Sequence, residues 1–282
     1  MSKYIAAIIL YNPNINQLQK CLTPIANNVD LLYFIDNASK NEFEINEFIK
    51  KYSNAQIIRN NENQGLSKPF NKLLKYSKEH NFSHLLLLDQ DSEPSSNFIE
   101  ELKKHTNKNF VCSTPLLIHK SPDYQKAYGS TPQGETEIIK ESINSGTLIN
   151  LKELPESISF DENLFIDWID IDFFYQLELA SKKILRVNNA KLLINIGNQK
   201  IHHFFKYTWF SSGYSAFRLK KQAQDTVYFY LKYHKHNFVK GHITFLLWRW
   251  LMMLFFEKNR IRKSLAIISG LIQGFHQYKY LY

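Results

Sequence analysis

Cysteine is scarce in this chain, which has only Cys21 and Cys112. Neither belongs to a Cys-x-x-Cys pair or to a cluster of histidines. This argues against a disulfide framework or a structural zinc site and favours a reducing cytoplasm. Long apolar runs are also missing: residues 5–10 are too few for a secretory signal. Arg249 interrupts residues 243–256, the closest candidate for a membrane-spanning helix.

Acidic residues are outnumbered, with 26 Asp and Glu against 35 Lys and Arg, and the formal net charge is +9. Such a balance favours anionic partners, for example nucleotides, diphosphates or anionic lipid. A solvated, Lys-rich surface gives the same charge. Hydrophobic residues make up 44% and aromatic residues 15% of the chain. That composition excludes a disordered chain and suffices for a sizeable core.

The first hundred residues alternate between short apolar stretches and stretches with helical spacing. This alternation predicts a parallel sheet covered on both faces, with ligands bound beyond the carboxyl ends of the strands. We expect strands at 4–10, 31–35, 56–58 and 84–88 and helices at 14–27, 41–52, 67–80 and 94–105.

The rest of the chain changes character. We expect strands at 110–118 and within 136–151, a loop at 119–135, and a helix from Phe165 to Leu179 entered through an acidic turn. From about residue 205 onward aromatic and basic residues interleave without a strand rhythm. We therefore expect only helices there, with a soft boundary near residue 200.

Two carboxylates, Asp89 and Asp91, directly follow the fourth predicted strand. Mg²⁺ and Mn²⁺ favour oxygen ligands and keep waters and substrate phosphates, so one or two carboxylates suffice to hold them. The motif therefore indicates a ribose and metal-diphosphate site. A solvated acidic turn that caps the next helix, with Ser92 as the cap, is the alternative.

Three further acids, Asp167, Asp170 and Asp172, alternate with large apolar residues. A helix would place Asp167 and Asp170 on one face. Clustered acids can raise the pKa of one member, which suits a general base. Acids at a helix N-terminus, where they favour the dipole, are the alternative.

Polar residues elsewhere have more than one interpretation. Asp36, at the end of the second strand, suits a hydrogen bond from a base or ribose, or an Asx turn. Gly65 and Gly146 permit a close backbone approach to a ligand, as in any tight loop. The adjacent His202 and His203 would face opposite sides of a strand, so at most one would bind a given metal.

The C-terminal region combines aromatic residues such as Trp248 and Phe255 with cations such as Arg260 and Arg262. This combination is typical of a segment that lies in a membrane interface. A core-packing helix or the contact of a homodimer is the alternative. We expect no nucleic-acid partner, because no recognisable nucleic-acid module is present.

In order along the chain, these segments resemble family 2 inverting glycosyltransferases, specifically the rhamnosyltransferase-like branch. The resemblance covers residues 4–197 and extends faintly to the Gly270–Gly274 segment. The matching segments are Ile8-Ile9-Leu10-Tyr11-Asn12-Pro13, Phe34-Ile35-Asp36-Asn37-Ala38-Ser39, Asn60-Asn61-Glu62-Asn63-Gln64-Gly65, Leu88-Asp89-Gln90-Asp91-Ser92, Asn144-Ser145-Gly146-Thr147-Leu148-Ile149 and Phe165-Ile166-Asp167-Trp168-Ile169-Asp170-Ile171-Asp172.

The resemblance implies an α/β, GT-A-type nucleotide-sugar-binding domain over residues 1–200. Its central sheet would be mixed and mainly parallel. A helical, membrane-associating or oligomerising region would follow over 201–282. The donor would be a UDP- or dTDP-sugar, with Mg²⁺ or Mn²⁺ as cofactor.

Site roles carry over by position. Asp36 would contact the base, Asp89 and Asp91 would lie at the ribose and at the metal-bound diphosphate, and Asp170 would be the general base with Asp167 beside it. Further donor-binding residues by the same resemblance are Tyr11, Asn12, Asn63, Gly65, Gln90, Ser145 and Gly146.

One departure concerns the metal. The branch carries a histidine shortly before a Leu-Gly pair, whereas Ile194 stands before Asn195-Ile196-Gly197 here. His202, or its neighbour His203, is the candidate to replace that histidine as a metal or phosphate ligand. Later in the chain, Tyr214-Ser215-Ala216-Phe217-Arg218 and Gln224-Asp225 also depart from the branch.

The sequence therefore predicts a glycosyltransferase that extends a lipid-linked or surface polysaccharide from the cytoplasmic, inner face of the cell membrane, to which it binds peripherally. A catalytically silent nucleotide- or sugar-binding protein of a polysaccharide assembly complex is the alternative. Rhamnose, galactose, galactofuranose, glucose and N-acetylated hexoses all remain open as the donor sugar.

Overall fold

Two compact units make up the protein. The sheet unit comprises Met1–Asp161 and Asp170–Asn195, and the helical unit comprises Glu162–Ile169 and Ile196–Tyr282. The computed structural model describes residues 2–106, 109–194, 200–204, 207–211, 213–234, 247–248 and 250–281, with the backbone alone at 127–128, 200–204, 207–210 and 281.

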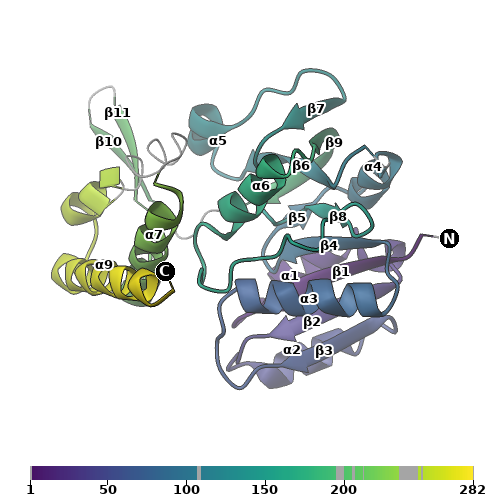
Figure 1. Cartoon of the computed structure of the whole chain (residues 1–282), viewed down its shortest axis with the longest axis horizontal. Helices are drawn as coiled ribbons and strands as arrows, with labels where there is room; N and C mark the ends of the chain where they lie inside the picture. Colours follow the sequence, from purple (N-terminus) through teal and green to yellow (C-terminus); the bar gives the residue numbers. More distant parts are fainter. Residues whose placement is uncertain are drawn as a thin grey trace. The chain divides into compact units, whose positions relative to one another are not determined.

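Four parallel strands form one half of the sheet (Figure 1). Ile9 lies opposite both Ile35 and Asp89, and Asp36 lies opposite Arg59, so the carboxyl ends of these strands share one edge. The predicted parallel arrangement is confirmed. The four strands are β1 (Tyr4–Leu10), β2 (Leu31–Asp36), β3 (Ala55–Arg59) and β4 (His84–Asp89).

Five further strands make the sheet mixed. The order is β3-β2-β1-β4-β8-β6-β9-β5, with β7 paired to β9. β8 runs antiparallel to β4 and β6, β5 and β7 run antiparallel to β9, and β6 and β9 are parallel. The bounds are β5 (Glu93–Pro94), β6 (Cys112–His119), β7 (Thr136–Ile139), β8 (Leu148–Asn150) and β9 (Ile184–Ile194).

Helices cover both faces of the first half of this sheet. Within α1, the buried residues Leu18, Cys21 and Leu22 recur at helical spacing, and the Asn14 side chain caps the helix by accepting from Gln17 N–H. The helices are α1 (Ile15–Leu22), α2 (Glu42–Ile49), α3 (Ser67–Glu79), α4 (Phe98–Lys104), α5 (Pro122–Tyr128) and α6 (Ile169–Leu179), with a 3-10 turn at Ala26–Asn28.

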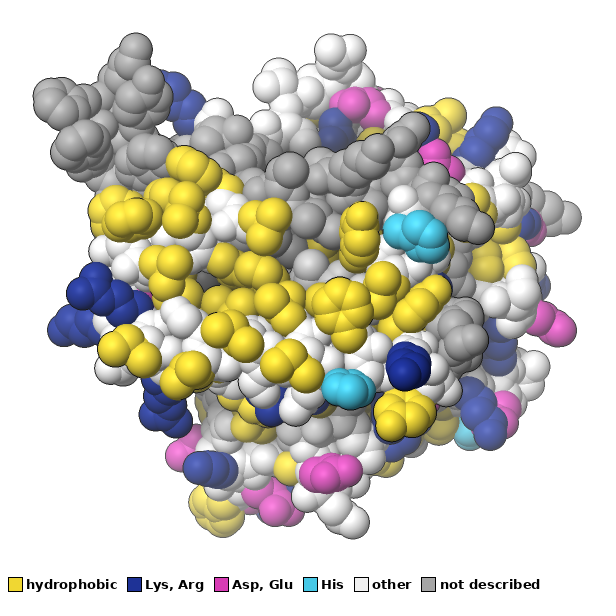
Figure 2. Space-filling view, turned by 60° about the vertical axis from the view of Figure 1, so that its left-hand side comes forward, with side chains coloured by type: hydrophobic (Ala, Val, Ile, Leu, Met, Phe, Trp, Pro, Cys, Tyr) yellow, Lys and Arg dark blue, Asp and Glu magenta, His cyan; other side chains and the backbone are white. Residues whose placement is uncertain are grey.

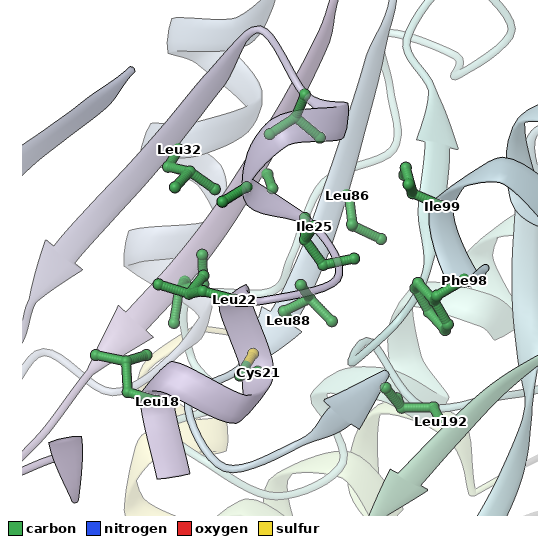
Figure 3. Close-up of a cluster of buried hydrophobic side chains, with 14 of the residues drawn as sticks. Leu18, Cys21, Leu22, Ile25, Leu32, Leu86, Leu88, Phe98, Ile99 and Leu192 are labelled. Atoms are coloured by element: carbon green, nitrogen blue, oxygen red, sulfur yellow. The ribbon is translucent and has the colours of Figure 1, made fainter. Parts of the chain in front are cut away.

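A large cluster of buried hydrophobic residues lies on one face of the sheet. Leu22 from α1, Phe98 from α4, Leu192 from β9 and Leu88 from β4 belong to one buried cluster (Figure 3). α3 packs against β1 and β4 on the opposite face (Figure 1). Burying both faces explains why β1 and β4 read as continuous apolar runs. Both cysteines are free and buried.

The helical unit contains a hairpin and long helices. Gly270 and Gly274 let the last helix approach its neighbour closely, because added Cβ atoms would lie 2.1 Å from Lys220 O and 2.6 Å from Gln224 O. Residues 247–248 and 250–256 are also helical. The bounds are β10 (Lys200–Phe204), β11 (Tyr207–Ser211), α7 (Ala216–Tyr233) and α9 (Arg260–Leu281).

Some predicted elements were wrong. β11 lies where we expected only helices, and α5 lies within the predicted loop at 119–135. The helix expected from Phe165 begins at Ile169, because Trp168 has φ +67°, which a right-handed helix excludes. Among the described residues, no helix is both long and apolar enough to cross a bilayer.

Candidate functional site

The Asp89-Gln90-Asp91 turn is fixed through its neighbours. The side chain of Gln90 accepts from Tyr11 N–H at 2.9 Å and donates to Tyr11 O at 3.2 Å. Gln17 Nε2 donates to Asp91 O at 3.0 Å. Asp89 and Asp91 are both solvent-exposed. The turn therefore presents two carboxylates at the carboxyl edge of β4 on a backbone tied to β1 and α1.

The segment 144–146 joins this turn to Asp170. Ser145 Oγ accepts from Asp89 N–H at 2.9 Å and shares a 2.8 Å hydrogen bond with Ser92 Oγ. One residue earlier, Asn144 N–H donates to Asp170 Oδ1 at 3.2 Å. All of these residues belong to the sheet unit. Two acidic motifs that are about 80 residues apart in the sequence are thus held by adjacent residues of one loop.

Gly146 allows this loop to pack tightly. It has φ +82°, and an added Cβ would lie 2.6 Å from Pro115 Cγ and 2.9 Å from Leu192 Cδ2. Beside it, the buried Asn144 amide has no hydrogen-bond partner for Oδ1 or Nδ2 within the described part of the chain. Buried polar groups without partners are few in native proteins.

Asp36 is buried and already has partners. Its Oδ2 lies 3.4 Å from Arg59 Nε, and its Oδ1 accepts from Ser39 N–H at 3.1 Å. Arg59 also pairs with Glu42 at 3.1 Å. Asp36 therefore closes a turn with Ser39 and lies against a cation at the end of the neighbouring strand. Its contact with a base or ribose stays a prediction.

The loop after β3 is tied to the end of β2. Asn37 Nδ2 donates to Gly65 O at 2.7 Å, and Gly65 N–H donates to Asn63 Oδ1 at 3.0 Å. Gly65 has φ +75°, which favours glycine. Asn12, with φ +46°, donates its N–H to Ser39 Oγ at 2.8 Å. Asn12, Asn63 and Gly65 thus lie at the same sheet edge as the Asp89 turn.

Asp167 belongs to the helical unit and precedes α6. The prediction that it shares a helix face with Asp170 was wrong, because Trp168 interrupts the helix between them. Asp167 Oδ1 lies 3.4 Å from an Arg218 guanidinium nitrogen.

Asp225, one of the residues at which the sequence departs from the rhamnosyltransferase-like branch, binds the same turn. Its Oδ2 accepts from the backbone N–H groups of Phe165, Ile166 and Asp167 at 3.1, 3.0 and 3.1 Å. Burial raises the pKa of the Asp225 carboxyl to about 7, and the three N–H groups oppose that rise. Asp225 therefore holds the turn in shape.

The structure describes the two predicted metal ligands, Asp91 and His202, to different extents. Asp91 lies in the acidic turn described above. His202 lies in β10, where its backbone pairs with Trp209, but its side chain falls outside the described part of the structure. Among the described residues, no three His, Cys, Asp or Glu side chains are grouped closely enough to hold a metal by themselves.

Several residues of this edge were not predicted. Gln17, Arg59 and Ser92 each bind a predicted site residue, through the bonds to Asp91 O, to Asp36 and to Ser145 given above. Of the three, only Arg59 could have been predicted from the sequence, because it lies at the end of the third strand of a parallel sheet. Gln17 contributes through a tertiary contact that no local pattern indicates. Ser92, the helix cap of the alternative interpretation, does not cap α4, which begins at Phe98, and it bonds to Ser145 instead.

A mixed sheet that is parallel at its first four strands, with an acidic turn and Asp170 both bonded to the loop at 144–145, defines an α/β protein with a candidate ligand site at the carboxyl edge of the sheet. Comparison with known protein families identifies its class. Residues 6–157, more than half of the chain, match the protein family described as "Glycosyl transferase family 2". The protein belongs to this family and is a glycosyltransferase.

Known proteins extend this result. The chain is 26% identical over 214 residues to "dTDP-rhamnosyl transferase RfbF" of Shigella flexneri, which covers 71% of each chain. A structure of GalNAc-T7 with UDP, GalNAc and Mn²⁺ aligns at 15% identity with a TM-score of 0.58. That alignment covers 82% of this chain but only half of GalNAc-T7.

A structure of S. aureus TarS 1–349 in complex with UDP aligns at 14% identity with a TM-score of 0.51. It covers 97% of this chain and 72% of that one. At such identities the two structures establish the fold, which is the predicted GT-A glycosyltransferase fold.

Proposed function

We propose that this protein is an inverting glycosyltransferase. It moves a sugar from a UDP- or dTDP-sugar to a hydroxyl of a lipid-linked or surface polysaccharide, with a divalent metal on the diphosphate and Asp170 as the general base. The observation that carries the proposal is the loop at 144–145, which bonds to the Asp89 turn and to Asp170 through adjacent residues. In this proposal, residues 1–200 bind the donor and catalyse transfer.

The donor assignment is supported by what the similar proteins bind or are named for. The Shigella relative is named a dTDP-rhamnosyl transferase, and the two aligned structures contain UDP. In this chain, Asp36, Asn63 and Gly65 lie at the ends of β2 and β3, where a parallel sheet binds a nucleotide. dTDP-rhamnose is therefore the first donor to test, followed by UDP-hexoses.

The donor set at the Asp89 turn suits Mg²⁺ or Mn²⁺. Asp89 and Asp91 offer exposed carboxylate oxygens, the ligands these ions prefer. The absence of a third acidic or histidine ligand among the described residues is compatible, because such ions complete their shell with water and substrate phosphates. When bound, the ion would offset charge on the leaving diphosphate.

Asp170 would remove the proton of the acceptor hydroxyl. As the acceptor oxygen bonds to the anomeric carbon, the bond from that carbon to the diphosphate oxygen breaks, and the nucleoside diphosphate leaves. Attack from the opposite face inverts the anomeric centre, and no covalent enzyme intermediate forms. The Asn144 N–H would hold the carboxylate of Asp170 in place during this step.

Asp170→Asn tests the proposal. Removing a general base lowers rates by about 10²–10⁴-fold. We expect sugar transfer to fall by at least about 100-fold, with the dissociation constant of the nucleotide sugar unchanged. Glu178→Gln, which replaces an acid near the other end of α6, is the matched control and should retain activity. Full activity of Asp170→Asn would refute the assignment of the base.

The same measurements of sugar transfer and donor binding also test the alternative, a catalytically silent binding protein. Such a protein would bind UDP- or dTDP-sugars but would transfer nothing even before substitution. The departures at Gln224-Asp225 motivated that alternative. The structure gives Asp225 a role in shaping the 165–167 turn, which is compatible with either kind of protein, so the transfer assay decides between them.

A further inference from the structure

The last helix carries an apolar stripe on its outer face. Ile261, Leu265, Ile268, Ile272 and Phe275 recur every three or four residues, which places them on one side of α9. Their exposed fractions run from 52% to 76%. The opposite side of α9 already has a partner, because Gly270 and Gly274 lie against α7. The packing of the helical unit therefore leaves the stripe exposed.

The preceding helical segment, residues 247–248 and 250–256, adds to this apolar surface. Figure 2 shows hydrophobic side chains gathered in one broad band on this side of the molecule. Monomeric soluble proteins rarely expose large contiguous apolar patches, and such patches mark sites of interaction. The exposed members of the segment are Leu247, Trp248, Leu251, Leu254, Phe255 and Phe256.

Cations border the apolar surface. Lys258, Arg260 and Arg262 are exposed, and no ion pair to them occurs among the described residues. Glu257 is the only acid between residues 247 and 282, and it pairs with Lys263. A shallow groove of about 560 Å³ lies where the cations meet the stripe, lined by residues 259–262 and Leu265.

We propose that this surface, the α9 stripe with residues 247–256 and its three bordering cations, docks on an anionic lipid bilayer. The apolar side chains would enter the boundary between headgroups and acyl chains, and Lys258, Arg260 and Arg262 would bind lipid phosphates. A second copy fits this surface less well, because the surface offers the cations of a two-fold partner no acid other than Glu257, which already pairs with Lys263.

Co-sedimentation of the full chain with vesicles tests the proposal. We expect binding to phosphatidylcholine vesicles containing phosphatidylglycerol and at least tenfold weaker binding to phosphatidylcholine alone. Each cation near an anionic surface contributes about fivefold in affinity, so Arg260→Gln with Arg262→Gln should weaken binding by about 25-fold. Leu265→Ser with Ile272→Ser should weaken it by at least tenfold.

Ile138→Ser is the matched control, because Ile138 is 65% exposed but lies on β7 of the sheet unit. It should bind vesicles as the unchanged protein does. Circular dichroism and nucleotide binding should be unaltered in every variant, which separates loss of docking from loss of fold or of the proposed function.

Two results would overturn the proposal. One is vesicle binding that is insensitive to phosphatidylglycerol or to both double substitutions. The other is a stable dimer in light scattering that Leu265→Ser with Ile272→Ser dissociates, since the stripe would then be a contact between copies.

Discussion

Replacing Gly146 by alanine should damage the loop that joins the acidic turn to Asp170. Two costs add at this position. An L-residue with φ near +80° costs roughly 1–2 kcal/mol. Overpacking costs about 1–3 kcal/mol, and here the new methyl would lie 2.6 Å from Pro115 Cγ and 2.9 Å from Leu192 Cδ2. We expect a loss of about 3 kcal/mol in the free energy of unfolding.

Gly134 provides a matched control, because it has φ +83° but no atom within 4 Å of an added Cβ. Gly134→Ala bears the backbone cost alone, about 1 kcal/mol. The difference of about 2 kcal/mol should appear as a melting temperature roughly 4–8 °C lower for Gly146→Ala than for Gly134→Ala.

Calorimetry measures the melting temperatures, and nucleotide-sugar titration provides a second readout. Gly146→Ala should also weaken donor binding, because Ser145 holds Asp89 N–H and Ser92. Gly134→Ala should leave donor binding unchanged. Equal melting temperatures for the two variants would refute the packing argument.

Two further predictions concern buried titratable groups. Asp225→Ala leaves three backbone N–H groups without their acceptor, and at about 1 kcal/mol each the free energy of unfolding in urea should fall by about 3 kcal/mol. Asp225→Asn keeps an acceptor oxygen and should lose less; equal losses would contradict the hydrogen-bond account. Burial, with nearby Lys152 and Lys103, lowers the pKa of His84 from 6.5 to about 4. The unfolded chain therefore binds the His84 proton at a higher pH than the folded protein does. The stability contribution of neutral His84 is full above pH 6.5 and is lost as pH falls toward 4, by about 1–2 kcal/mol at pH 5. His84→Leu should flatten this part of the urea-denaturation profile, and an unchanged slope would show that His84 is not responsible.

The local patterns along the first hundred residues predicted most of the sheet edge. Apolar runs of five to seven residues identified β1, β2 and β4, and the polar residues after them lie at the edge where parallel strands end. This worked because strand period, turn chemistry and chain order are local properties. The expected helix at Phe165 was wrong at its start, where Trp168 has a positive φ. The backbone before it is bound by Asp225, about 60 positions later in the chain, and local propensity carries no information about such contacts.

By itself, the sequence determined the alternation of strands and helices, the parallel first half of the sheet, and the presence of acids at strand ends. Only the tertiary structure decided which of these acids are bound by the same loop. The bonds from Ser145 to Asp89 and from Asn144 to Asp170 join residues 56 and 26 positions apart. Likewise, the apolar stripe of α9 has the spacing of a core-facing helix, and its exposure follows from α7 packing on the glycine side instead. Periodicity specifies which side chains share a face, but which neighbour covers that face depends on contacts between distant parts of the chain.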